Sequence, residues 1–245
     1  MILELDCGNT LIKWRLLGSE QSGFAKDNAS LLKSLSNIGY EALVTGIRLV
    51  SVRSADETQA IASALEKVFG LSCNIARSAE RLGGVRNGYE DYHCLGMDRW
   101  LAIVGAYDLA RKACVIIDLG TAITVDFVSS TGEHFGGFIC PGISLLRAEL
   151  STHTSRIRYG AEDARSALLS TEPGRSTASA VERGCLWMVR GFVREQLVLA
   201  ARLLDSDYEV FLTGGDARLI REHYPDARFV PDLVFTGLAI ACPLE

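Results

Sequence analysis

Several features that would assign the chain to a class at once are missing from its sequence. Its seven cysteines never occur as Cys-x-x-Cys and are odd in number, so neither a disulfide framework nor a zinc knuckle is indicated. Lys and Arg number 25 against 30 Asp and Glu, which gives a formal net charge of −5. Because binding of a phosphate backbone normally needs a basic face, nucleic acid is not an expected partner.

Long apolar runs and a basic leader segment are missing as well. The chain opens on a strand-like run that contains Glu4 and Asp6, and no stretch approaches the roughly 20 apolar residues that cross a membrane. No long linker or low-complexity segment interrupts the 245 residues, of which 48% are hydrophobic. We expect a globular protein of one or two domains that is neither exported nor inserted into a membrane, and whose thiols stay reduced in the cytoplasm.

The nucleotide-binding fingerprints Gly-x-x-x-x-Gly-Lys-Ser/Thr and Gly-x-Gly-x-x-Gly do not occur either, so P-loop and Rossmann sites have no support. A polar turn, Asp6-Cys7-Gly8-Asn9-Thr10, lies instead between two strand-like runs, 2–5 and 11–16. A glycine in such a turn lets an anion approach outward-pointing backbone amides. Asn9 and Thr10 can donate hydrogen bonds to phosphate oxygens, and Lys13 adds a positive charge. The turn therefore has the composition of half a phosphate site.

This turn occurs a second time. Asp118-Leu119-Gly120-Thr121-Ala122 stands between the apolar runs 113–117 and 123–128, so the acid, the glycine and the hairpin context all match. We interpret the match as an internal duplication. After a later strand-like run, Gly214-Gly215 would let a flat adenosine group approach the backbone. One Asp-x-Gly-Asn turn alone is common turn chemistry, but two copies and a Gly-Gly element favour a nucleotide site.

An irregular segment between the two halves holds candidates for a second substrate. Asp98, in Gly96-Met97-Asp98-Arg99, can accept the proton of an attacking hydroxyl group, and the Arg99 cation favours the ionised carboxylate. The alternative is that Asp98 and Arg99 pair with each other or cap the helix predicted over 100–109. Tyr89 is either a substrate contact or a packing residue. Residue types alone leave both questions open. The four histidines are isolated and are expected in surface or packing roles.

Helical periodicity predicts further elements. An amphipathic helix is predicted over 56–69, ending at Gly70, and a long helix over 177–204. The apolar surface of the long helix is wider than one covered face requires, so we expect it to pack on two sides. A short helix is predicted over 217–223 and a strand over 42–52.

In their order along the chain, these motifs resemble the superfamily of acetate kinase, sugar kinases, Hsp70 and actin, whose two halves each carry an Asp-x-Gly hairpin. Within it, the chain is most similar to the type III pantothenate kinases. The resembling segments are Asp6-Cys7-Gly8-Asn9-Thr10-Leu11-Ile12-Lys13, Gly96-Met97-Asp98-Arg99, Asp118-Leu119-Gly120-Thr121-Ala122-Ile123-Thr124, Gly136-Gly137-Phe138-Ile139-Cys140-Pro141-Gly142 and Thr213-Gly214-Gly215-Asp216. They span nearly the whole chain in the family's order.

The resemblance implies an α/β fold of two duplicated ribonuclease H-like domains, the actin-like ATPase fold, with a cleft between them. Domain 1–110 is expected to hold the first phosphate loop and part of the pantothenate site, and domain 111–245 the second loop, the adenosine motif and a dimerisation helix. The implied reaction is ATP-dependent phosphorylation of pantothenate to 4′-phosphopantothenate, the first step of coenzyme A biosynthesis. The alternatives are a non-catalytic regulator on the same fold, and another small-molecule kinase of the superfamily. A regulator would be expected to have lost Lys13, Asp98 or Arg99, and all three are present.

The resemblance also implies roles for single residues, with Asp98 as the catalytic base. The residues expected to bind ATP are Asp6, Cys7, Gly8, Asn9, Thr10, Leu11, Ile12, Lys13, Thr121, Gly214 and Gly215. The residues expected to bind pantothenate are Tyr89, Gly96, Met97, Asp98, Arg99 and Thr177. Thr177 is implied to reach the neighbouring site of a homodimer, although by itself it is only a threonine at a helix start. Asp118 is implied to bind a monovalent cation, K⁺ or NH₄⁺, and Asp6 to lie on the side of the Mg²⁺ that accompanies ATP. Spacing alone does not distinguish potassium from a second magnesium.

Overall fold

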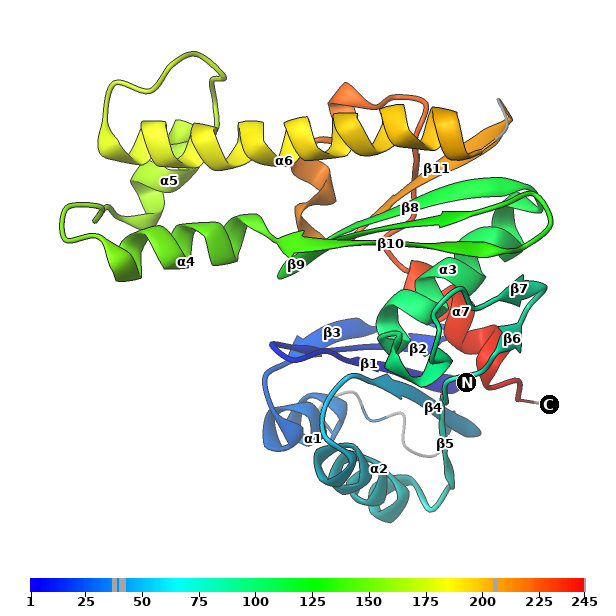
Figure 1. The fold of residues 1–245 in the computed structure, drawn as a ribbon. Helices are drawn as coiled ribbons and strands as arrows, with labels where there is room; N and C mark the ends of the chain where they lie inside the picture. The colour runs from blue at the N-terminus through cyan, green and yellow to red at the C-terminus, as the bar shows by residue number, and fades with distance from the viewer. Residues whose placement is uncertain (37–38, 40–42, 205–206, 245) are drawn as a thin grey trace. The chain divides into compact units, whose positions relative to one another are not determined.

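The computed structural model describes residues 1–36, 39, 43–204 and 207–244. By its internal contacts the chain divides into two compact units (Figure 1). Unit 1 comprises Met1–Arg111, Thr131–His134 and Asp232–Glu245, and unit 2 comprises Lys112–Ser130 and Phe135–Pro231. Each unit is built on its own five-stranded sheet.

The sheet of unit 1 has the strand order β3-β2-β1-β4-β5. Its strands are β1 (Ile2–Cys7), β2 (Ile12–Leu17), β3 (Ser22–Ala25), β4 (Gly46–Ser51) and β5 (Cys73–Ile75). β1 pairs antiparallel with β2 and parallel with β4. The predicted N-terminal hairpin is therefore confirmed. Of the strand predicted over 42–52, the later part forms β4, residues 43–45 lie outside any strand, and residue 42 lies outside the described residues.

Helices cover both faces of this sheet (Figure 1). The helices on one face are α1 (Asn28–Ser36) and α2 (Ala55–Phe69), and those on the other are α3 (Met97–Ala110) and α7 (Leu233–Ala241). α2 confirms the predicted amphipathic helix, since Ser54 forms a capping box at its start and Gly70 ends it at φ 67°. α3 and α7 cross closely, because a Cβ at Gly237 would lie 2.0 Å from the Leu101 carbonyl oxygen. The shorter elements of the unit are β6 (Arg81–Leu82), β7 (Val85–Arg86) and the 3-10 helix η2 (Tyr92–Cys94).

The central strand β1 presents different chemistry on its two faces. Leu3, Leu5 and Cys7 alternate with Glu4 and Asp6, and they pack into the apolar core with α1 and α2. Glu4 is fully buried and pairs with two arginines from β2 and β4. These arginines also hold the start and end of α7 through hydrogen bonds to an aspartate side chain and a cysteine carbonyl. Asp6 follows Glu4 on the same face, which is the face covered by α3 and α7.

The sheet of unit 2 repeats this topology with the order β10-β9-β8-β11-β12. Its strands are β8 (Ala113–Leu119), β9 (Ala122–Val128), β10 (His134–Pro141), β11 (Tyr208–Thr213) and β12 (Arg228–Phe229). The central strand β8 again pairs antiparallel with the next strand and parallel with a later one. The two aspartates occupy equivalent positions: Asp6 faces Lys13 in register, and Asp118 faces Thr124. The predicted duplication is thus visible in strand order and register.

The helices of unit 2 are α4 (Ile143–His153), α5 (Ala161–Ala167), α6 (Thr177–Leu203) and the 3-10 helices η3 (Gly215–Leu219) and η4 (Arg221–His223). α6 confirms the predicted long helix and packs Cys185, Val189 and Val193 into the core with β8 and β9. The helix predicted over 217–223 is wrong, because hydrogen bonds between residues three apart close two separate 3-10 turns there.

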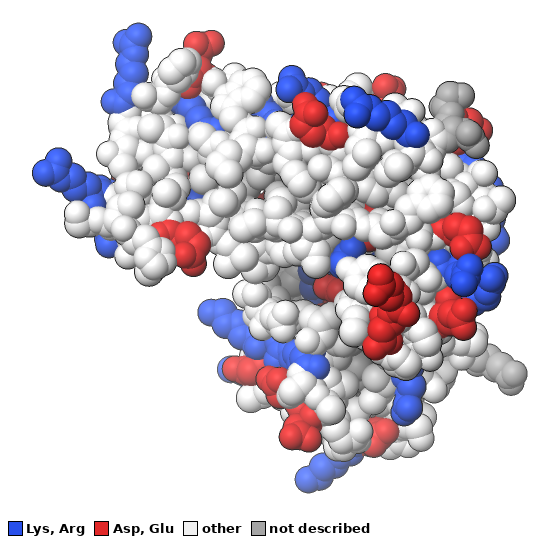
Figure 2. Space-filling view, viewed as in Figure 1, with Lys and Arg blue, Asp and Glu red and all other residues white. Residues whose placement is uncertain are grey.

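Basic and acidic side chains lie beside each other on the surface shown in Figure 2. Within the described ranges, no helix combines the length and the apolar character that a membrane span requires.

Candidate functional site

The loop predicted to bind phosphate first along the chain connects β1 and β2. Asn9, Thr10 and Leu11 are exposed there, whereas Cys7 and Ile12 are fully buried. Ile12 can therefore reach a phosphate only through its backbone. Burial raises the pKa of the Cys7 thiol to about 12, which keeps it protonated and unreactive. The polar side chains of Asn9 and Thr10 at the tip of the loop are thus accessible to an anion.

Arg53 anchors this loop, a role that the sequence did not reveal. Its Nε donates to the Gly8 carbonyl oxygen at 2.9 Å. No motif marks Arg53 in the sequence: it follows β4, and it reaches the loop because the carboxyl ends of the parallel strands β1 and β4 meet at one edge of the sheet. This guanidinium adds positive charge beside the loop.

Two carboxylates share an electrostatic environment in unit 1. Burial raises the pKa of Asp6 from 3.8 to about 6, the Lys13 ammonium opposes that rise, and the negative charge of Asp98 adds to it. Lys13 Nζ lies 4.0 Å from Asp6 Oδ2. The structure therefore brings together the first phosphate loop and the predicted catalytic base.

Asp98 belongs to the first turn of α3, which begins at Met97. Gly96 occupies the N-cap position, so Asp98 is not the capping residue. Its Oδ1 accepts the backbone N–H of Arg99 at 2.7 Å. Met97 accepts a hydrogen bond from Ser78 through its sulfur at 3.3 Å, which fixes the outer side of the same turn. The segment 96–99 is thus an ordered helix start rather than part of an irregular loop.

Tyr89 and Arg99 form a direct pair beside this turn. Arg99 Nη1 donates to the Tyr89 hydroxyl oxygen at 2.7 Å, and the guanidinium carbon lies 5.6 Å from the centre of the tyrosine ring. The side chain of Arg99 is buried, and Tyr89 is partly exposed. All the predicted pantothenate residues except Thr177 therefore lie in unit 1.

The second predicted phosphate loop and the Gly-Gly element meet in unit 2. Gly214 follows β11 at φ 88°, and a Cβ there would lie 2.3 Å from Asp118 Oδ1 and 2.5 Å from the Leu119 carbonyl oxygen. Gly142, before α4, donates its backbone N–H to the Thr121 carbonyl oxygen at 2.9 Å. Glycine at 214 is thus required by the close approach, and Asp118, Thr121 and Gly214 are brought together.

The two residues after Gly214 differ in their surroundings: the backbone at Gly215 is open, and the side chain of Asp216 lies near charged groups. A Cβ at Gly215 would meet no atom within 4 Å. The carboxyl group of Asp216 is half-buried, which raises its pKa, and the Arg147 cation opposes this rise. Arg147 pairs with the fully buried Glu182 of α6. The sequence had indicated neither Arg147 nor Glu182, because they meet only when α4 and α6 pack.

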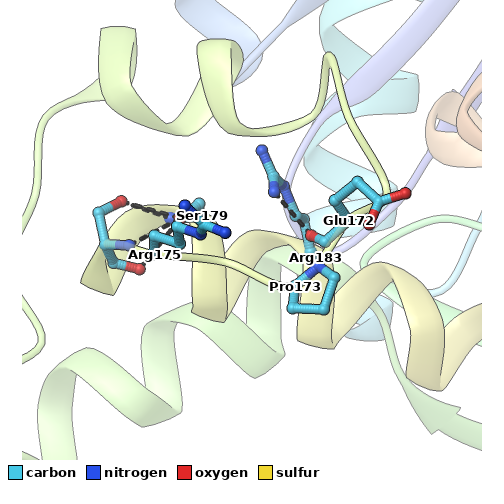
Figure 3. A pocket seen from close by; sticks show the side chains of 6 residues that line it. Glu172, Pro173, Arg175, Ser179 and Arg183 are labelled. Carbon is cyan, nitrogen blue, oxygen red and sulfur yellow. Dashed lines mark hydrogen bonds between the residues drawn. The ribbon is translucent and has the colours of Figure 1, made fainter.

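Thr177 is the exposed first residue of α6. Ser176 is the N-cap and forms reciprocal hydrogen bonds with Ser179, so capping does not need the Thr177 hydroxyl. Two cavities of ≈ 720 and ≈ 460 Å³ lie at this helix start, and Thr177 lines the smaller one. Figure 3 shows the larger cavity, where Arg183 donates to the Glu172 carbonyl oxygen at 2.6 Å. The start of α6 therefore borders two cavities within unit 2.

The described residues contain no group of three or more His, Cys, Asp or Glu side chains that could hold a metal ion. Mg²⁺ commonly takes one or two carboxylates together with substrate phosphates and water. The single, largely buried carboxylate of Asp6 fits a magnesium ion that arrives with ATP.

Two sheets of one topology, each with an aspartate as the second-to-last residue of its central strand, have the fold of the duplicated actin-like ATPases and kinases. Solved structures agree at the level of fold. MreB5 of Spiroplasma citri bound to AMPPNP matches with a TM-score of 0.52 and 11% identity, over 98% of this chain and 95% of that chain. A Campylobacter jejuni protein assigned to the Baf family of transcriptional activators matches with a TM-score of 0.59 and 19% identity, over 96% and 94%.

Sequence relatives define the family. The type III pantothenate kinase family model matches residues 2–198. The type III pantothenate kinase of Pseudomonas aeruginosa is 56% identical over 250 residues, with 100% of each chain covered. The chain belongs to the type III pantothenate kinase family. It is accordingly an ATP-dependent kinase of pantothenate, which acts in coenzyme A biosynthesis and uses a divalent cation such as Mg²⁺ with its ATP.

Proposed function

We propose that Asp98 is the general base with which this chain phosphorylates the primary hydroxyl of pantothenate, giving 4′-phosphopantothenate and ADP. The observation that carries the assignment is the position of Asp98 in the first turn of α3, next to the Arg99 that pairs with Tyr89, where its negative charge also raises the pKa of Asp6. The hydroxyl oxygen attacks the γ-phosphorus, the bond to the β-γ bridging oxygen breaks, and the proton passes to Asp98. Tyr89, Arg99 and the turn 96–98 bind pantothenate, with the guanidinium of Arg99 facing its carboxylate.

The residues of the two loops bind ATP in this proposal. Domain 1–110 supplies the loop from Asp6 to Lys13, and domain 111–245 supplies Thr121 with the adenosine motif Gly214-Gly215. When ATP is bound, Mg²⁺ would neutralise charge on its phosphates, and the Asp6 carboxylate would lie on the side of the site that faces this ion. Asp118 binds the activating monovalent cation, K⁺ or NH₄⁺.

The test is a comparison of Asp98→Asn with Asp108→Asn, a matched change on the same helix. Asp98→Asn is expected to lower kcat by about 10²–10⁴-fold, because a positioned base contributes that much, while ATP binding is retained. Asp108→Asn should leave both nearly unchanged. Pantothenate-dependent ADP release, with K⁺, NH₄⁺ or Na⁺ as the only monovalent cation, measures turnover and the cation together. Comparable turnover in Asp98→Asn would refute the assignment.

We further propose a homodimer in which α6 forms the interface and Thr177 completes the neighbouring site. Trp187, Met188 and Val198 are 55%, 62% and 43% exposed on α6. A Cβ at Gly184 or Gly191 on the same helix would meet no atom within 4 Å. An exposed apolar stripe of this kind is typical of a protein interface.

Sedimentation of Met188→Lys tests the dimer. We expect this variant to be monomeric with a raised KM for pantothenate, while Phe24→Lys, an equally exposed apolar site on β3 at 66% exposure, stays dimeric. A fully active monomeric wild-type protein would remove the proposal. We keep the cytoplasm as the compartment, a prediction from the cysteine pattern.

A further inference from the structure

His134 is a buried histidine that the proposed chemistry does not use. It is 3% exposed, and its ring is nearly parallel to that of Tyr89, with 9° between the planes and 6.3 Å between the centroids. The backbone N–H of Gly88 donates to His134 Nδ1 at 3.3 Å. This nitrogen therefore carries no proton, and the ring is tied to the residue that precedes Tyr89.

The turn that precedes His134, the first residue of β10, is fixed against the β6–β7 hairpin. The backbone N–H of Arg86 donates to the Gly132 carbonyl oxygen at 2.8 Å, and Arg86 Nη1 lies 3.6 Å from Glu133 Oε2. Gly132 has φ 82°, and a Cβ there would lie 2.1 Å from the Gly84 carbonyl oxygen. Only glycine permits this approach, so the backbone before His134 has little freedom.

Tyr89 connects His134 to the substrate side of unit 1. Its backbone N–H donates to Asn87 Oδ1 at 3.0 Å, and its hydroxyl accepts from Arg99 Nη1 at 2.7 Å. A change in the χ1 angle of Tyr89 would swing the whole ring, move this hydroxyl oxygen and release the guanidinium. The His134 ring is stacked beside the Tyr89 ring, so it is placed to limit that swing.

We propose that His134 is a positioning residue for pantothenate: it orients the Tyr89 ring, which in turn aims the Arg99 guanidinium. This inference rests on the proposed function, in which Tyr89 and Arg99 contact pantothenate. His134 acts through Tyr89 and touches no reacting group.

The experiment measures kcat and both KM values for three substitutions of His134. His134→Phe keeps a flat ring without the acceptor, His134→Asn keeps an acceptor without the ring, and His134→Ala removes both. We expect His134→Ala to raise the KM for pantothenate about three- to tenfold, the size of one lost hydrogen bond, with kcat and the KM for ATP within about twofold. The Phe and Asn variants should show smaller rises in the same parameter. His93→Phe is the matched control, because exposed His93 stacks on Tyr92 in the same segment.

The decisive comparison repeats His134→Ala in a Tyr89→Leu background. If His134 acts through Tyr89, the KM for pantothenate should not rise further there. An equal rise in both backgrounds, or equal rises in both KM values, would overturn the inference. If the unmodified protein releases ADP with pantothenate and all three His134 variants match its kinetics, the inference about His134 is overturned and the proposed function stands. Unmodified protein that releases no ADP with pantothenate would overturn the proposed function, and the inference with it.

Discussion

Asp6→Asn is expected to stabilise the protein while it impairs ATP use. The carboxyl group is largely buried in unit 1, and its pKa rises from 3.8 to about 6, chiefly because burial disfavours the charge. Each pH unit between these values is worth about 1.4 kcal/mol. The ionised carboxylate therefore costs the folded state about 3 kcal/mol at neutral pH.

The ionisation of Asp6 makes the expected change in the free energy of unfolding depend on pH, and its sign follows from the two pKa values. Below pH 3.8 the carboxyl is neutral in both the folded and the unfolded state, so it contributes no difference. Between 3.8 and about 6 the folded state binds more protons, so stability falls as the pH rises. Above about 6 the cost is constant. The stabilisation of Asp6→Asn over the wild type should therefore grow from near zero at pH 4 to about 3 kcal/mol at pH 7.

Urea denaturation followed by circular dichroism at several pH values measures this difference. The other titrating groups are common to both proteins and cancel when the two free energies of unfolding are subtracted. The same variant should show a higher KM for ATP, because asparagine offers no charge to a magnesium-bearing triphosphate. The reasoning is refuted if the stability difference stays constant between pH 4 and 7, or if the variant is the less stable protein at pH 7.

Two further predictions concern packing. Glu4→Gln should lower the free energy of unfolding by about 3–5 kcal/mol, because two arginines then lose a buried carboxylate; Glu195→Gln, at an exposed ion pair, is the control in the same urea titration. Gly214→Ala should lower the melting temperature, because its Cβ would collide with Asp118, while Gly215→Ala should leave the melting temperature unchanged and raise only the KM for ATP. A Gly215→Ala variant with unchanged KM for ATP would remove the adenosine assignment.

The sequence correctly predicted the strands and helices that are determined by residues close together in the chain. The two hairpins follow from short runs around a polar turn, and α2 follows from its apolar spacing and its capping residues. The site residues in these elements, such as Asp6 and Asp118, could therefore be found from the sequence. The error at 217–223 has a local cause as well, since a segment of about two turns is too short to separate the 3.0-residue period of 3-10 turns from the 3.6-residue period of an α-helix.

The contacts that the sequence could not reveal join residues far apart in the chain. Arg53 reaches the Gly8 carbonyl only because β4 lies beside β1. His134 meets Tyr89 only because the turn 131–134 docks on the β6–β7 hairpin. Each of these residues is ordinary in its own neighbourhood, so no periodicity or motif marks it. Arg53 and His134 acquire their roles only through contacts with residues that are distant in the chain.

The duplication also predicts how the two aspartates differ. Lys13 stands in register with Asp6, and the equivalent position opposite Asp118 is Thr124. Unit 1 thus supplies a cation from its own strand, whereas unit 2 has a neutral side chain at that register position. This difference supports the proposal that Asp118 uses a cation from solution.

Thr124→Lys should place a positive charge at the position in register with Asp118. Lys13 Nζ lies 4.0 Å from Asp6, and the equivalent register places a lysine at 124 within similar reach of Asp118. We expect the variant to retain activity in Na⁺ alone and to gain little from K⁺ or NH₄⁺, whereas the uncharged Thr124→Met should keep the dependence of the wild type. ADP release at fixed ionic strength, with the cation varied, measures both. If Thr124→Lys kept the full dependence on K⁺ or NH₄⁺, Asp118 would not be the residue through which the monovalent cation acts.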